Sequence, residues 1–395
     1  MGAAIFTGAA FSALALWAGG SGYQIDMDTF KAWARIVNEV GFSQIYRQDI
    51  FLDYPPGYLY VLRGLEQLRL LLGLDASSQA FTLVMKLPSL LADLGCAGAL
   101  LWVGKRRLGE KPGLLLAGAY LFCPAVLVNS AQWGQADSFC TAILLLSVAL
   151  LYCGQYEVSA LLYGVSVACK PQMLIFAPLY LFFVIRERKW LRLVTGILCG
   201  VGALLLTALP FTTNFHFQWL WTEYTSTLNY YDYYSVNAYN FWALLGKNWE
   251  MLPQDALGKW LLTLGAPVLA TAGCGALLLG SKRRDAVFFA PALLMGVMYL
   301  FGVKMHERYL FPALLFLLLS CAATGDRRIL RSFGVTAGAH YLNVAHVLWI
   351  FQELGQNYVP NTWGTRLLAA VQMASVGYGL WGAFWVYWKD RPLPP

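Results

Sequence analysis

Trp190–Pro210 reads WLRLVTGILCGVGALLLTALP, an apolar run in which Arg192 is the one charged side chain. A helix needs about 20 predominantly apolar residues to cross the hydrocarbon core of a bilayer. The run therefore predicts a membrane-spanning helix. Arg186, Arg188 and Lys189 come directly before it. Short basic clusters at the ends of such spans face the cytoplasm.

The composition extends this prediction to the whole chain. Of its 395 residues, 58% are hydrophobic and 12% are charged, whereas a soluble domain carries about 25% charged residues. The mean hydropathy is +0.54. We expect one all-α polytopic membrane domain over residues 1–395. The net charge of +7 does not indicate a nucleic-acid partner, because the basic residues lie in short clusters between apolar runs.

We expect about 11–13 membrane-spanning helices in total. The candidate spans are residues 2–19, 83–104, 112–129, 137–153, 158–169, 171–185, 190–210, 258–280, 286–303, 308–324, 335–351 and 365–387. The two spans on either side of Lys170 are short. We interpret them as half-helices or tilted segments.

The basic clusters predict the orientation of these spans. Sixteen of the 28 Lys and Arg residues fall on one side, which the positive-inside rule makes cytoplasmic together with both termini. These clusters are Lys105/Arg106/Arg107/Lys111, Arg186/Arg188/Lys189/Arg192, Lys282/Arg283/Arg284, Arg327/Arg328/Arg331 and Lys389/Arg391. The outer side then receives the long segments 20–82 and 211–257, and we expect the chemistry there.

The first outer segment opens with two carboxylates, Asp26 and Asp28. Phe30, Trp33 and residues 36–37 follow at helical spacing, which predicts an amphipathic helix lying on the membrane. One Asp can serve as the N-cap of this helix. A carboxylate at the mouth of a low-dielectric span can also act as a general base, and both interpretations stay open.

Asp53-Tyr54-Pro55-Pro56-Gly57 forms a second feature of this segment. The Pro-Pro-Gly run predicts a rigid turn. Asp53 and Tyr54 either belong only to that turn or contact a substrate.

Asn129–Ser138 reads NSAQWGQADS and is the most polar turn between two apolar runs. It combines Trp133 with Gln135 and Asp137. Sugar sites use this mixture, because an aromatic face stacks on the ring while amides and carboxylates bind hydroxyls. The alternative for Asp137 is a helix cap.

Two further outer positions carry polar side chains that a substrate could use. Lys170 precedes Pro171, and the backbone before a proline is extended; its ammonium either snorkels or binds a phosphate. Asn237 and Asn240 are three residues apart in an aromatic-rich run of the middle segment, 230–242. That run fits an interfacial belt or a carbohydrate platform.

Val303–Pro312 reads VKMHERYLFP and places His306, Glu307 and Arg308 between two apolar runs. The predicted orientation puts this turn on the outer face, so the positive-inside rule does not explain its charges. An anionic ligand at the membrane surface, such as a lipid phosphate, would explain them.

The chain resembles the C-type (GT-C) membrane glycosyltransferases, and most closely the bacterial branch related to the second GPI mannosyltransferase. The resemblance runs from about residue 20 to about residue 315. It rests on the acidic pair after the first span, Gln132–Ser138, Lys170–Gln172, Asn237–Trp242 and His306–Pro312.

The resemblance implies the GT-C fold, with amphipathic helices in the first and the middle outer segments. It also implies an inverting glycosyltransferase that uses a polyprenyl-phosphate-linked sugar, with mannose as the first choice. The acceptor would be a glycan, lipid or protein at the outer face of a bacterial cytoplasmic membrane.

The resemblance also implies roles for individual residues. Asp26 is the first choice for the general base and Asp28 the second. His306 and Arg308 would hold the donor phosphate, with Lys170 as a weaker candidate, and Glu307 would orient Arg308.

We expect no cofactor, since a single donor phosphate can be stabilised by Arg and His without a metal; the alternative is a divalent cation bridged by Asp26 and Asp28. A flippase or transporter of a lipid-linked sugar is the rival function, and a non-catalytic lipid-binding subunit is a second. A transporter would place ionisable groups deep in several spans, where Lys86 and Asp93 are the candidates. These two could equally form a structural pair.

Overall fold

The structure, a computed structural model, describes residues 2–391 and is helical almost throughout. The helices that coincide with predicted spans are α1 (Gly2–Gly19), α5 (Gln79–Leu108), α6 (Glu110–Leu121), α8 (Asp137–Tyr152), α9 (Tyr156–Cys169), α10 (Ala177–Arg186), α11 (Trp190–Ala208), α14 (Ala256–Gly280), α15 (Ala290–Phe301), α16 (Phe311–Thr324), α17 (Arg327–Leu354) and α18 (Trp363–Ala383). The other α-helices are α2 (Gln24–Val40), α3 (Phe42–Ile45), α4 (Pro56–Leu71), α7 (Pro124–Leu127), α12 (Gln218–Tyr230) and α13 (Phe241–Leu244). The remaining elements are η1 (Val128–Trp133), η2 (Pro171–Phe176), η3 (Leu209–Phe211), η4 (Arg284–Phe288), η5 (Phe384–Trp388), β1 (Ser235–Val236) and β2 (Met305–His306).

The prediction of an all-α polytopic membrane protein is confirmed. Among residues 2–391, five helical stretches are long and apolar enough to cross a membrane by length and composition. A sixth crossing arises if the pair Glu110–Leu121 and Pro124–Trp133, bent by 43°, counts as one span. Shorter apolar helices, among them α8, α9 and α16, have 10–17 residues and fall below the length used for a span, so the count of 11–13 stays a prediction.

The predicted break at Lys170 is present. Helix α9 ends at Cys169, Lys170 is extended with φ −154° and ψ 128°, and the 3-10 helix η2 begins at Pro171. This is the backbone that a residue before proline prefers, since the proline ring disfavours a helical conformation there. The break turns the Lys170 side chain out of the helical register.

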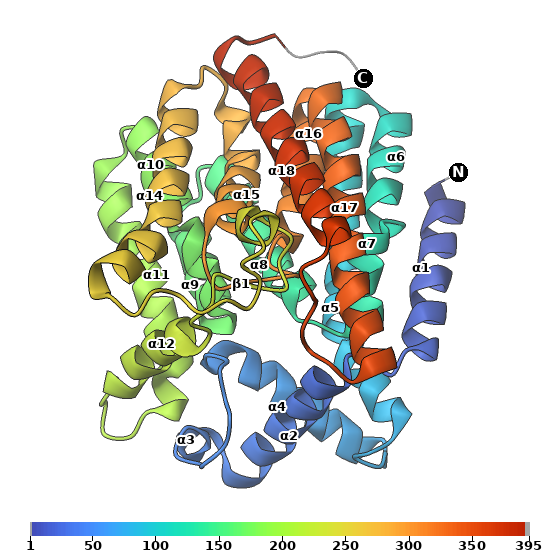
Figure 1. Ribbon diagram of the computed structural model, residues 1–395. Coiled ribbons are helices and arrows are strands. Elements are labelled where there is room, and N and C mark those ends of the chain that lie inside the picture. Colours follow the sequence, from blue (N-terminus) through green and yellow to red (C-terminus); the bar gives the residue numbers. More distant parts are fainter. Residues whose placement is uncertain (1, 392–395) are drawn as a thin grey trace.

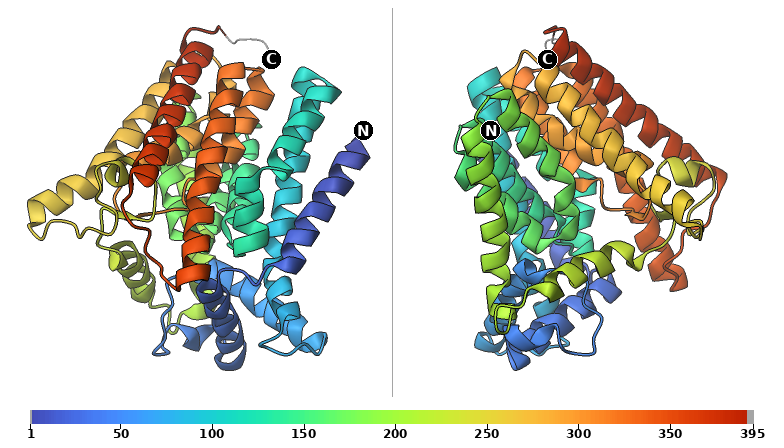
Figure 2. Two further views of the ribbon diagram at one scale, coloured as in Figure 1. Left: turned by 45° about the vertical axis from the view of Figure 1, so that its right-hand side comes forward. Right: turned by 90° about the vertical axis from the view of Figure 1, so that its left-hand side faces the viewer.

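The long helices run side by side, and both marked termini lie toward one end of the bundle (Figure 1). Helices α2, α3 and α4 gather at the opposite end, and α12 lies toward that same end (Figures 1 and 2). The two long segments predicted on the outer side therefore share one end of the molecule, away from the termini.

The amphipathic helix predicted in the first outer segment forms as α2. Its stripe of Met27, Phe30, Trp33, Ala34 and Val37 is at most 3% exposed. The stripe does not lie on the membrane, which corrects the prediction made from its spacing. It packs against α4 and forms a second apolar cluster with residues of that helix.

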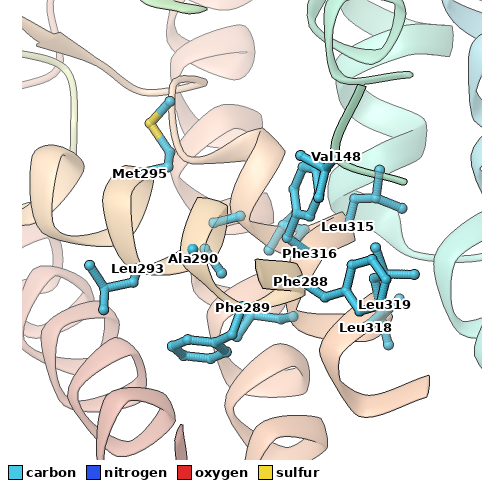
Figure 3. Packing of buried hydrophobic residues seen from close by; sticks show 14 of the residues in the cluster. Val148, Phe288, Phe289, Ala290, Leu293, Met295, Leu315, Phe316, Leu318 and Leu319 are labelled. Atoms are coloured by element: carbon cyan, nitrogen blue, oxygen red, sulfur yellow. The ribbon is translucent and has the colours of Figure 1, made fainter. Parts of the chain in front are cut away.

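The main core surrounds α15 and α16. Phe288 and Phe289 pack with Leu315, Phe316 and further residues in Figure 3. Every residue of α16 from 311 to 323 is buried. The turn between α15 and α16, which contains His306–Arg308, is thus held between two buried helices.

Two close backbone contacts position the site. Strand β2 pairs in parallel with β1, so that Val236 lies opposite His306. At the start of α4, a Cβ on Gly57 would stand 2.7 Å from the backbone of Ala168. Only glycine permits this approach, which brings the Asp53–Tyr54 turn beside the break at Lys170.

Candidate active site

Asp26 is the centre of the candidate site. It lies in the first turn of α2 and is half-buried. Its Oδ2 accepts a hydrogen bond from Nε1 of Trp133 at 2.8 Å, and a second from Nε2 of Gln135. Two donors hold one carboxylate oxygen, and among residues 2–391 no hydrogen bond to Oδ1 is found.

The segment that supplies these donors has a specific local structure. Residues 128–133 form the π-helical turn η1, a geometry that is frequent at functional sites. Gly134 ends the turn with φ +90°, and the N–H groups of Gly134 and Gln135 both donate to the carbonyl of Asn129. A Cβ at Gly134 would meet Met27 Cε at 2.7 Å. Glycine thus lets this turn reach α2.

Arg308 brings a fixed positive charge to the same place. Its guanidinium lies 5.5 Å from the ring centroid of Trp133, and its Nη1 bonds Glu307 Oε1 at 2.7 Å. Burial acts to lower the pKa of Arg308, but the charges of Asp26 and Glu307 oppose it and the pKa is raised well above its ordinary value. Arg308 is therefore a permanent cation in contact with Glu307, and its role in binding a phosphate stays a prediction.

Asp53 is a second carboxylate of the site. Burial raises its pKa to about 6, while the charge of Arg308 acts in the opposite direction and that of Asp26 adds to the rise. The Thr227 hydroxyl of α12 donates to the carbonyl of Asp53 at 3.4 Å. Asp53 thus lies among the charged groups of the site, and its neighbour Tyr54 is buried.

Lys170 forms a buried ion pair with Asp137, the first residue of α8. Both side chains are at most 4% exposed. The ammonium also lies 5.9 Å from the ring centroids of Tyr54 and Tyr309. Two residues predicted to bind substrate therefore bind each other in this structure, at the edge of the charged cluster.

His306 lines the cluster as a buried, neutral ring. Burial lowers the pKa of His306 well below its ordinary value, and the charges of Arg308 and Lys170 lower it further. Its ring makes an edge contact with Tyr231 at 4.6 Å between centroids. His306 can thus donate one N–H to an anion but adds no positive charge at neutral pH.

Three other predicted residues have different surroundings from those expected. Trp133 is 1% exposed, so its ring face is not available for stacking on a sugar. Asn237 and Asn240 are buried, and their amides bond groups of the protein: Asn237 Nδ2 donates to the carbonyl of Asn357 at 2.7 Å, and Asn240 caps α13. Their surroundings are those of scaffold residues.

Asp28 lies on the exposed side of α2. It accepts a hydrogen bond from Nε2 of Gln24 at 3.2 Å, one turn earlier. The two aspartates of the first outer segment therefore differ in environment, because Asp26 alone bonds Trp133 and Gln135.

The ionisable groups within α5 are bound separately. The Lys86 ammonium donates to the carbonyls of Gly20 at 2.8 Å and Ala131 at 2.9 Å. Asp93 accepts hydrogen bonds from the hydroxyls of Tyr120 and Ser130. Lys86 and Asp93 do not pair, and Lys86 instead connects the residue after α1 to η1.

Sequence reasoning missed Tyr23, Glu223 and Asn357. Tyr23 precedes α2 and stacks on Trp133, with ring centroids 4.5 Å apart. Burial raises the pKa of Glu223 in α12 to about 7, and the charge of Asp53 adds to this rise. None of these residues stands in a periodic pattern, so only their contacts across the fold connect them to the site.

An apolar groove of about 470 Å³ lies between α9, α10 and α11. Tyr163, Leu174, Leu181 and Gly200 are among the residues that line it. The Tyr163 hydroxyl donates to the carbonyl of Met173 at 3.0 Å, which places one end of the groove beside η2 and the break at Lys170. The groove can hold an apolar chain.

Two comparisons with known proteins bear on this site. The family described as ALG3 protein matches residues 135–275, a range that includes Gln135 and Lys170 but neither Asp26 nor Arg308. The chain is also 25% identical over 195 residues to the dolichyl pyrophosphate Glc1Man9GlcNAc2 alpha-1,3-glucosyltransferase of Arabidopsis thaliana. That relative is a glucosyltransferase.

The aligned part covers 46% of this chain and 38% of the Arabidopsis protein. The chain therefore spans well under half the length of this relative. Together the two similarities support the resemblance to C-type membrane glycosyltransferases at the level of a lipid-linked-sugar enzyme.

Proposed function

We propose that the protein transfers a hexose from a polyprenyl-phosphate donor to an acceptor hydroxyl at the outer face of a bacterial cytoplasmic membrane. One observation carries this proposal. Asp26 is held by Trp133 and Gln135 beside the permanent cation Arg308. A fixed carboxylate next to a fixed cation is what a single displacement at a sugar phosphate requires.

The reaction follows from these two charges. Oδ1 of Asp26 takes the proton of the acceptor hydroxyl while the acceptor oxygen forms a bond to the anomeric carbon. The bond from that carbon to the phosphate oxygen breaks, and the polyprenyl phosphate leaves with the electron pair. The proton ends on Asp26. A single displacement inverts the configuration at the anomeric carbon.

Arg308 and His306 stabilise the leaving phosphate. The guanidinium supplies charge and directional N–H donors, and the neutral imidazole supplies one further donor. Glu307 holds the guanidinium by its bond at 2.7 Å. The apolar groove beside η2 supports a lipid-linked donor, because it offers a place for the polyprenyl chain near the phosphate-binding groups.

The resemblance and the relative favour particular classes of sugar and acceptor. Mannose follows from the resemblance to the second GPI mannosyltransferase, whereas the Arabidopsis relative is named as a glucosyltransferase. The same name describes a lipid-linked oligosaccharide as the molecule that the relative acts on, which favours a glycan over a protein as the acceptor here.

The test uses the full chain reconstituted in nanodiscs. Polyprenyl-phosphate mannose and polyprenyl-phosphate glucose are supplied separately with a lipid-linked oligosaccharide acceptor, and the product is read by mass spectrometry and by NMR of the new glycosidic bond. We expect transfer with inversion from one of the two donors.

Two results would overturn the proposal. One is translocation of a fluorescent polyprenyl-phosphate sugar across proteoliposomes without transfer, which would support a flippase. The other is saturable donor binding with no turnover for either sugar, which would support a lipid-binding subunit.

A further inference from the structure

The loop between α17 and α18, residues 355–362, contacts Tyr23, which stacks on the Trp133 that bonds Asp26. It lies outside the range matched by the ALG3 protein family. The carbonyl of Asn357 accepts a hydrogen bond from Asn237 Nδ2 at 2.7 Å, and the N–H of Val359 donates to Asn237 Oδ1 at 3.0 Å. Asn237 adopts φ +63°, a left-handed conformation that asparagine tolerates better than most residues. The loop is thereby fixed to the middle outer segment.

The same loop contacts the first outer segment through one side chain. Oδ1 of Asn357 accepts a hydrogen bond from the hydroxyl of Tyr23 at 2.6 Å. Tyr23 is buried and directly precedes α2, whereas Asn357 is exposed. Phe351, at the end of α17, packs on the same tyrosine with ring centroids 4.4 Å apart.

Tyr23 in turn holds Trp133 in two ways. Its N–H donates to the carbonyl of Trp133 at 3.1 Å. Its ring stacks on the indole with centroids 4.5 Å apart and an interplanar angle of 28°. Since the indole N–H of Trp133 bonds Asp26 Oδ2, the rotation of the Tyr23 ring and the direction of the donor to Asp26 are connected.

We propose that Asn357 is a positioning residue for Asp26, acting through Tyr23 and Trp133. The role of Asp26 as base rests on the proposed function, but the mechanical connection does not. A carboxylate needs a narrow range of positions to take a proton from the acceptor, and a misplacement of about 1 Å can lower a rate by about 100-fold. The loop after α17 thus completes a site whose chemical groups lie elsewhere in the chain.

The kinetic test compares four variants. Asn357→Ala removes the acceptor and Tyr23→Phe removes the donor of the hydrogen bond between the Tyr23 hydroxyl and Asn357 Oδ1. Each change should lower kcat by about tenfold with little change in the KM for the donor. The double variant should be no slower than either single one, because both changes break the same contact. Asn357→Asp keeps an acceptor oxygen in place and should restore most of the rate.

Asn361→Ala is the matched control, because Asn361 lies in the same loop but bonds the carbonyl of Gly246. Equal loss in Asn361→Ala and Asn357→Ala would reduce the loop to a structural role and overturn the proposal. Unchanged kcat in Asn357→Ala, or additive losses in the double variant, would overturn it as well. The unfolding temperature of each variant shows whether a loss reflects misfolding.

A cryo-EM map of Asn357→Ala separates this inference from the proposed function. We expect Trp133 Nε1 to move beyond hydrogen-bond distance of Asp26 Oδ2, while the rest of α2 stays in place. A map in which that bond is intact overturns the positioning role. If the wild-type chain transfers no sugar, the proposed function fails, and the map still decides the mechanical connection.

Discussion

Nε1 of Trp133 donates to Oδ2 of Asp26 at 2.8 Å, across 107 positions of the sequence. The bond joins the first outer segment to the polar turn after α7. Both donors, Trp133 and Gln135, bond Oδ2, and the proposed function assigns the other oxygen, Oδ1, to the acceptor hydroxyl. The following predictions depend on this arrangement.

Trp133→Phe should lower kcat by about 10- to 100-fold, because a hydrogen bond to a charged group contributes about 1.5–3 kcal/mol. The aromatic ring that stacks on Tyr23 remains, so folding should be preserved. Trp219→Phe is the control, since the indole of Trp219 donates to the Thr212 hydroxyl at 3.1 Å rather than to a carboxylate. Transfer rates that respond equally to both changes would contradict a specific role for Trp133.

Arg308→Gln should lower kcat by about 10²- to 10³-fold and weaken donor binding, because the leaving phosphate loses its main stabilising charge. Arg308→Lys should recover part of the rate, since lysine keeps the charge but not the forked geometry. Lys304→Gln is the control within the same turn, because Lys304 pairs with Asp232 at 2.9 Å. The measurement is steady-state kinetics with varied donor concentration. A larger loss of kcat in Lys304→Gln than in Arg308→Gln would contradict the role of Arg308.

Lys170 and Asp137 should behave as a buried pair. Removing one partner by Lys170→Met leaves an uncompensated charge, which costs about 3–5 kcal/mol of stability. The double variant Lys170→Met/Asp137→Leu should regain most of that loss, as measured by thermal unfolding. If donor affinity falls in the double variant while stability recovers, Lys170 binds the donor phosphate after all.

The pKa of Asp53 predicts a pH dependence of stability. In the unfolded chain the carboxyl ionises near its ordinary pKa of about 4, and in the native protein at about 6. The native state therefore binds one more proton between these values, so stability falls as the pH rises from about 4 to about 6.

Asp53→Asn cannot ionise and should escape this loss. The stability of this variant relative to the wild type should rise across that window and level off above it. The total gain in free energy of unfolding should be at most about 3 kcal/mol. The measurement is thermal unfolding in nanodiscs from pH 4 to pH 8. A difference that stays constant with pH would show that Asp53 titrates normally in the native protein.

Several local features of the fold were predictable from sequence. The spacing of Phe30, Trp33 and Val37 predicted a helix with one buried face, and the Lys170-Pro171 dipeptide predicted a break, because both signals act over a few residues. The spacing of apolar residues predicts that one face of the helix is buried, but it does not identify the surface that covers this face. For that reason α2 was expected on the membrane rather than against α4.

The contacts of the site were less predictable. Asp26, Gln135 and Arg308 were singled out because polar groups are unusual beside apolar spans, and the structure brings them together. Trp133 was expected to face a sugar but is buried beneath the site. Tyr23 and Asn357 gave no signal, since their contact spans 334 positions and no periodic pattern records such a pair.

The most direct test of the account is sugar transfer by Asp26→Asn beside Asp28→Asn, with donor binding measured on the same samples. Both changes remove a carboxylate from one turn of α2, but Asp28 is exposed. We predict that Asp26→Asn retains donor binding and loses about 10²- to 10⁴-fold in kcat, while Asp28→Asn stays near the wild-type rate. Transfer by Asp26→Asn at the wild-type rate would contradict the assignment of Asp26 as the base.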